Sequence, residues 1–157
     1  MRVVLALVAV VAVSGCSLTE SNAPLPFRSL ASASTGQPIG PVSVVHTEAA
    51  ADALRERIGL ADPIEADFGR ETVLAISTFG ACPATNYRLT VLDVEGDGGR
   101  ALVSARVERV GDAGGGALTY PVSVIAVEGL EVVSIGGAAE ADIALRLSGD
   151  QQDCALR

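Results

Sequence analysis

The chain has 157 residues, of which 49% are hydrophobic and only five are aromatic, with no tryptophan. This length suits one domain with a short extension, and the apolar content excludes disorder over most of the chain. The 19 acidic and 11 basic side chains give a net charge of −8. That balance argues against nucleic-acid binding, because phosphates are held by clustered Lys and Arg.

The N-terminus has the pattern of an export signal. Arg2 precedes an apolar run at 3–13, which is of signal-peptide length and too short to span a membrane as a helix. The run leads into a stretch that resembles the lipobox of bacterial lipoproteins, with the residues Val13, Ser14, Gly15 and Cys16. This resemblance implies a signal peptide at 1–15 and acylation of Cys16. An ordinary secretory signal followed by an incidental cysteine is the alternative.

Residues 16–26 are polar and contain two prolines, a composition typical of a flexible tether. We therefore expect a single domain at 27–157 that the lipid on Cys16 holds to a membrane of the cell envelope. Ser17 follows the cysteine in place of Asp, so nothing marks the protein for retention at an inner membrane. In a Gram-negative source, this predicts a location at the outer membrane, on its periplasmic side.

One segment after the tether has the spacing of an amphipathic helix that lies on a core. Thr47 is suited to the N-cap and Gly59 to the end of this helix. Charged side chains occupy the outer face. The apolar face is predicted to consist of Ala50, Ala53, Leu54 and Ile58.

Most other segments of the domain have the pattern of β-strands. At 100–110 and 118–127, apolar and polar residues alternate, which predicts one buried and one solvent-facing side. Leu118 and Tyr120 are assigned to the buried side, and Pro121 predicts an edge strand or a bulge. The predicted strands are 27–31, 41–45, 71–79, 88–95, 100–110, 118–127, 131–135 and 142–148.

These elements together predict an α+β fold. Short strands joined by Gly-rich turns favour a mainly antiparallel β-sheet, sandwich- or barrel-like, with one packed helix. A βαβ arrangement is excluded because no second helix separates the strands.

Two cysteines remain once Cys16 is assigned to lipid. An even pair in an exported protein predicts a disulfide, here between Cys82 and Cys154. Two free thiols in an active site are the alternative. They would lack a nearby base, because the only histidine, His46, is distant in the sequence.

No pattern points to a catalytic centre. A catalytic triad would have to use His46, and a zinc site of the His/Cys kind cannot be assembled from one histidine. Asp93, Glu95 and Asp97 faintly resemble a calcium loop, but Ser104 stands where that loop requires Glu, so a hairpin turn explains them better. We therefore expect a protein that is no enzyme and that uses no metal or cofactor.

The domain resembles the C-terminal domain of PrcB-type proteins, a family named after a lipoprotein that stabilises a secreted protease complex. The resemblance covers about residues 27–136 and is carried by Phe27-Arg28-Ser29-Leu30, Val44-Val45-His46-Thr47, Asp67-Phe68, Glu71-Thr72-Val73-Leu74 and Thr119-Tyr120-Pro121. At 83–87 the chain keeps the Pro and Tyr of a family turn but lacks its two glycines. The resemblance implies a non-catalytic domain that binds an exported protein, such as a protease or its complex.

Two loops and a strand are the expected contact surface for that partner. Loops on a rigid sheet usually carry binding, and Tyr offers a large contact area with little entropy to lose. Tyr87 and Tyr120 are expected as anchors, with placement of either ring in the core as the alternative. The expected contact residues are Pro83, Asn86, Tyr87, Gly114, Gly115, Tyr120 and Pro121.

The same loops also resemble, in their order along the chain, the inhibitory loops of chagasin-type cysteine-protease inhibitors. Residues 82–87 stand in the place of that family's first loop and 111–116 in the place of its Gly-rich loop. Its third motif has no counterpart in this chain. The alternative function is therefore a protease inhibitor that uses 82–87 and 111–116.

Overall fold

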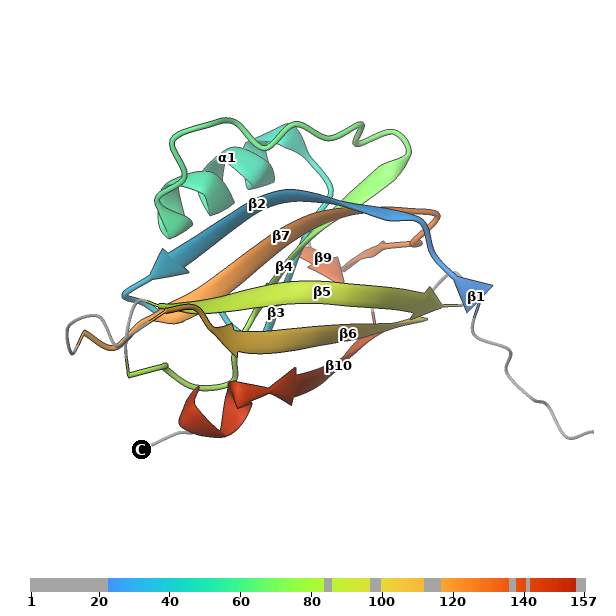
Figure 1. Ribbon diagram of the computed structural model, residues 1–157. Helices are drawn as coiled ribbons and strands as arrows, with labels where there is room; N and C mark the ends of the chain where they lie inside the picture. Colours follow the sequence, from blue (N-terminus) through green and yellow to red (C-terminus); the bar gives the residue numbers. More distant parts are fainter. Residues whose placement is uncertain are drawn as a thin grey trace, which may run out of the picture.

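The computed structural model describes residues 23–83, 86–96, 100–111, 117–135, 138–140 and 142–154, so Cys16, Gly114 and Gly115 lie outside it. Two β-sheets are layered on each other, and one helix covers the outer face of one of them (Figure 1). The predicted α+β fold, mostly β and mainly antiparallel with one packed helix, is confirmed. Its elements are β1 (Ala23–Pro24), β2 (Phe27–Thr35), β3 (Val42–Val45), α1 (Glu48–Ile58), β4 (Glu71–Ser77), β5 (Tyr87–Gly96), β6 (Arg100–Arg109), β7 (Tyr120–Glu128), β8 (Val133–Ile135), β9 (Ala138–Glu140), β10 (Asp142–Gly149) and the 3-10 helix η1 (Asp150–Cys154).

The helix α1 begins and ends where its cap residues predict. The Oγ1 of Thr47 accepts a hydrogen bond from the N–H of Ala50 at 3.2 Å, and Gly59 adopts a left-handed φ of 70°. The buried residues are Ala51, Leu54 and Ile58. Ala53 is exposed, so the apolar face is rotated slightly from the predicted one, because Ala51 lies one turn before Leu54.

The two four-stranded sheets have the strand orders β1-β5-β6-β10 and β2-β7-β4-β3, and β8 and β9 pair as a separate two-stranded antiparallel sheet. Their pairings are antiparallel except that between β6 and β10, which is parallel. One core lies between the sheets and contains Leu74, Leu89, Val103 and Ile125. A second core lies between the β2-β7-β4-β3 sheet and α1.

The strand β7 is neither an edge strand nor bulged at Pro121, the two alternatives that this proline predicts. It lies between β2 and β4 and is buried on both sides, because the other sheet covers one face and α1 the other. Pro121 is tolerated because the pairing with β4 stops at Ser77 and Val122, so its missing N–H costs no ladder bond on that side. The assignment of Leu118 to the buried side is wrong, since this residue is 64% exposed.

The sandwich has two ends, which we name by their features. At the β1 end, β1 pairs with Gly96 and the N–H of Leu25 donates to the carbonyl of Val94 at 2.7 Å. Residues 23–26, assigned to the tether from sequence, therefore lie against the sandwich. At the disulfide end lie the first residues of β5 and β7, the last residues of β6 and β10, and η1 (Figure 1). The ten residues of β5 span about 30 Å between these ends.

Within the described ranges, no helix is long and apolar enough to cross a membrane.

Candidate functional site

A disulfide between Cys82 and Cys154 joins the segment before β5 to η1, as predicted. Both cysteines are buried, with exposed fractions of 0% and 2%. The alternative of two free thiols in an active site is therefore wrong. The bond holds the C-terminal helical turn against the sandwich.

Backbone hydrogen bonds extend this cross-link to the segment before β7. The N–H of Cys82 donates to the carbonyl of Thr119 at 2.7 Å, and the N–H of Thr119 donates to the carbonyl of Cys82 at 3.0 Å. The segments preceding β5 and β7 are thus fixed side by side at the disulfide end.

The described parts of the two predicted binding loops also meet here. The side-chain amide of Asn86 donates to the carbonyl of Gly111 at 3.1 Å. The N–H of Val110 donates to the carbonyl of Asn86 at 2.6 Å. The loop before β5 and the loop after β6 therefore begin at the same end of the sandwich, since the two strands run antiparallel.

The structure places Tyr87 in the core and not on the surface. Its exposed fraction is 7%, and its hydroxyl donates to the Oδ2 of Asp153 at 2.9 Å. Burial, together with this hydrogen bond, raises the pKa of Tyr87 above its usual value. Tyr87 therefore positions η1, and its ring is not free to act as a contact anchor.

The other expected contact residues have different environments. Pro121 is fully buried, so it offers no surface to a partner. Asn86 and Tyr120 are half-buried and Pro83 is exposed. Of the described residues in the expected set, only Pro83 is thus fully accessible.

Three large apolar side chains outside the expected contact set are exposed at the disulfide end. Phe79 follows β4 and is 50% exposed, Val110 follows β6 and is 45% exposed, and Leu118 precedes β7 and is 64% exposed. We call these residues the apolar rim. The sequence held a signal for two of them, because Val110 and Leu118 border a Gly-rich turn, where polar residues are usual.

A depression of about 440 Å³ adjoins the apolar rim beside Phe79. It lies between the end of β10 and η1, and Leu147, Gln151 and Gln152 contribute to its lining. The disulfide end thus combines exposed apolar side chains, a hollow lined with amides, and a cross-linked backbone. These are properties of a protein-binding surface.

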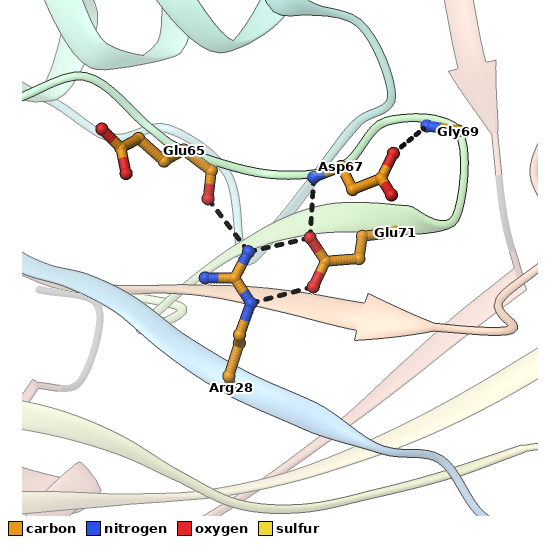
Figure 2. Close-up of polar contacts among 5 residues, drawn as sticks. All are labelled: Arg28, Glu65, Asp67, Gly69 and Glu71. Carbon is orange, nitrogen blue, oxygen red and sulfur yellow. Dashed lines mark hydrogen bonds and ion pairs between the residues drawn. The ribbon is translucent and has the colours of Figure 1, made fainter.

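A charged network lies at the β1 end. The Nε and Nη2 of Arg28 donate to the two carboxylate oxygens of Glu71, each at 2.8 Å (Figure 2). The carbonyl of Glu65 accepts from Arg28 at 3.1 Å, and the N–H of Asp67 donates to Glu71 at 2.8 Å (Figure 2). The network joins β2, β4 and the loop before β4 around an open depression of about 460 Å³.

These contacts stabilise the charged form of Glu71. The hydrogen bond from Arg28 and that from the backbone of Asp67 lower the pKa of Glu71 from 4.5 to about 2. Hydrogen bonding to Glu71 raises the pKa of Arg28 in turn. A carboxylate with so low a pKa is poorly matched to proton transfer near neutral pH, so the network is a structural link.

We predict that Glu71 contributes to acid sensitivity. Because its folded pKa is lower than its unfolded pKa, its stabilisation is complete above about pH 4.5 and is lost as the pH falls toward 2. Glu71→Gln should lower the free energy of unfolding at neutral pH and flatten its decline in this window, as measured by urea unfolding at several pH values. The exposed Glu131→Gln is the control, and equal pH profiles for Glu71→Gln and the wild type would contradict the prediction.

The remaining candidates for chemistry are separated in the fold. His46 follows β3, whose last residue pairs with Val73 near the start of β4, so it lies toward the β1 end and away from the cysteines. In the part of the chain that the structure describes, no group of three or more His, Cys, Asp or Glu side chains is placed to hold a metal ion.

The chain matches no protein-family model, and neither the curated proteins nor the solved structures contain a match. Its function is therefore inferred from the sequence patterns and from the geometry of the two ends.

Proposed function

We propose that this protein is a lipid-anchored protein of the cell envelope that binds and stabilises an exported protease or protease complex and catalyses no reaction itself. The observation that supports it most directly is the apolar rim of Phe79, Val110 and Leu118 at the disulfide end. Exposed apolar groups that gather in one place mark interaction surfaces more often than scattered ones do. The PrcB-like motifs of the sequence point to the same class of partner.

The positions of the two ends fit an anchored binding protein. Cys16 precedes Ala23 by seven residues, a stretch that reaches at most about 25 Å. A lipid on Cys16 therefore keeps the β1 end close to the membrane. The apolar rim lies at the other end of strands about 30 Å long, where a partner can approach it.

The cross-links at the disulfide end suit it to binding. The Cys82–Cys154 bond, the paired backbone of Cys82 and Thr119, and the Asn86–Gly111 hydrogen bond hold the segment before β5 to η1, to the segment before β7 and to the loop after β6. Little conformational entropy is then lost when a partner binds, so a small apolar contact suffices. Anchoring also raises the local concentration of a partner at the membrane.

The test is affinity capture of the anchored protein from its own envelope, with the bound proteins identified and quantified. A double variant, Phe79→Ser with Leu118→Ser, should recover at least about tenfold less of the exported partner, because two contact side chains lose their apolar area. Leu92→Ser is the matched control. Leu92 is 48% exposed but lies within β5, so its replacement should leave capture unchanged.

Two results would contradict the proposal. If no exported protein is recovered in stoichiometric amounts, the protein has no stable partner. If the same partner is recovered undiminished by the double variant, the contact does not lie at the apolar rim. Circular dichroism of both variants verifies that they are folded.

A second candidate function, inhibition of a cysteine protease, is supported by the Asn86–Gly111 hydrogen bond. This contact brings the bases of the two chagasin-like loops together, as an inhibitor that inserts both loops would need. The purified chain should then inhibit a papain-like protease at nanomolar concentration. Asn86→Ala should weaken inhibition by loosening the bases of the loops, because it removes the side-chain hydrogen bond to Gly111 and leaves the backbone bond from Val110. The absence of inhibition at micromolar concentration would rule this function out.

A further inference from the structure

The strand β5 has an edge that is only partly paired. In its sheet, β5 lies between β1 and β6, but β1 pairs with Glu95 and Gly96 alone. Over 87–91, no strand among the described residues pairs with β5 on the β1 side. Unpaired strand edges present a row of backbone donors and acceptors that another strand can use.

The hydrogen-bond pattern shows which backbone groups point to this open edge. The N–H of Arg109 donates to the Oδ2 of Asp150 at 2.9 Å, away from β5, so Arg109 and its register partner Tyr87 form a non-hydrogen-bonded pair. Backbone groups alternate in direction along a strand. Leu89 and Val91 therefore direct their N–H and C=O groups to the open edge.

Beyond this open section, the same edge of β5 is already paired with β1. Ala23 and Pro24 pair with it, and Leu25 donates to the carbonyl of Val94. A bulge at Leu92 separates the two sections, and the Oδ1 of Asp93 accepts from the N–H of Val94 at 2.9 Å, which closes the edge at that point. The open section consequently ends at Val91.

A groove of about 460 Å³ runs along the open section. Its walls are β5 and β2, which is itself an edge strand of the second sheet, and its floor is β7. The groove has apolar and hydroxyl-bearing side chains, and the exposed Arg88 lies at its rim. No described residue forms an ion pair with Arg88. The lining residues are Phe27, Ser29, Ser32, Arg88, Leu89, Thr90, Val91, Ser123 and Ile125.

We propose that this groove binds an extended peptide segment of another protein, which pairs with Leu89 and Val91 as an added strand. Main-chain hydrogen bonds supply affinity in this mode of recognition, and alternate side chains supply specificity. Inward side chains of the peptide meet the apolar floor at Ile125, and a neighbouring acidic side chain pairs with Arg88. The site is distinct from the apolar rim, and the inference does not rest on the proposed function.

The test uses a phage-displayed library of random octapeptides against the full-length chain in detergent. The enriched peptides are synthesised, and each backbone amide is N-methylated in turn. Methylation should weaken binding by about tenfold or more at every second amide, where the N–H faces β5, and should have little effect at the amides between.

Arg88→Glu provides a second measurement on the protein side. It should weaken the enriched acidic peptides by about tenfold, because an attraction becomes a repulsion. Arg146→Glu is the matched control. Arg146 is likewise exposed but lies on β10, at the far edge of the same sheet. Circular dichroism verifies that both variants are folded.

Four results would overturn the inference. The first is a library that enriches no peptide, and the second is peptide binding that does not depend on which amide is N-methylated. The third is peptide binding unaffected by Arg88→Glu. The fourth is peptide binding that is lost in the Phe79→Ser, Leu118→Ser variant but retained in Arg88→Glu. A homodimer in sedimentation that Arg88→Glu dissociates would show that a second copy of the chain occupies the edge, which also contradicts the proposal.

Discussion

Removal of the disulfide by Cys82→Ala with Cys154→Ala is expected to lower the free energy of unfolding by about 4 kcal/mol. The bond joins residues 72 apart in the sequence, so it removes much of the conformational freedom of the unfolded chain. Both positions are buried, and small apolar residues leave no polar group there without a partner. The loss should therefore come mainly from the unfolded chain.

A local effect should accompany the global one. The C-terminal turn η1 is held by the disulfide, by the hydrogen bond from Tyr87 to Asp153, and by that from the N–H of Arg109 to Asp150. Without the covalent link, η1 is retained by these two hydrogen bonds and by its packing against β6 and β10. We expect faster amide hydrogen exchange at position 82 and at Thr119, whose paired backbone lies beside the lost bond.

Urea unfolding of the wild type and the double variant, each with and without reductant, measures this effect. Reductant should lower the free energy of unfolding of the wild type by nearly as much as the double substitution does, and it should leave that of the variant unchanged. A difference below about 1 kcal/mol would contradict the chain-entropy argument. A variant that still responds to reductant would show that the effect comes from another source.

Elements that are defined by capping residues or by the alternation of apolar and polar residues could be predicted from the sequence. The helix was located by Thr47 and Gly59, because capping depends only on neighbouring residues. The strand β6 could be located by alternation, because its side chains alternate between the core and the outer face of the sheet, and the Gly-rich turn before it indicated the hairpin with β5. Each of these signals lies within a few residues of the element that it defines.

The features that depend on neighbours distant in the sequence could not be predicted. Pro121 predicts an edge strand or a bulge in β7, and nothing local shows that α1 and the second sheet cover both of its faces. The parallel pairing of β10 with β6 has no sequence signature, since alternation does not depend on strand direction. β9 was missed because three residues carry too short a pattern.

The candidate site shows the same limit. The disulfide followed from counting cysteines, a property of the whole chain. Tyr87 was expected on the surface because its loop position was visible in the sequence, whereas its hydrogen bond to Asp153 spans 66 residues. The apolar rim was missed because Phe79 and Leu118 look like core residues until the ends of the strands are known.

The lipid on Cys16 is expected to be the membrane anchor. Each CH₂ group buried in a bilayer contributes about 0.8 kcal/mol, and two or more acyl chains hold a protein stably where one gives only reversible binding. We expect residues 17–157, exported behind an ordinary cleavable signal without a lipobox, to be recovered in the soluble fraction. Mass spectrometry of the wild type should find an acylated Cys16 at the N-terminus.

The protein that consists of residues 17–157 also separates anchoring from binding. It retains Phe79, Leu118 and the disulfide end unchanged, so it should capture the same partner once purified, although it no longer holds that partner at the membrane. The Cys82→Ala, Cys154→Ala variant is the converse control, because it keeps the lipid and should stay in the membrane fraction. Residues 17–157 remaining in the membrane fraction would show that another part of the chain, or the partner itself, provides the attachment.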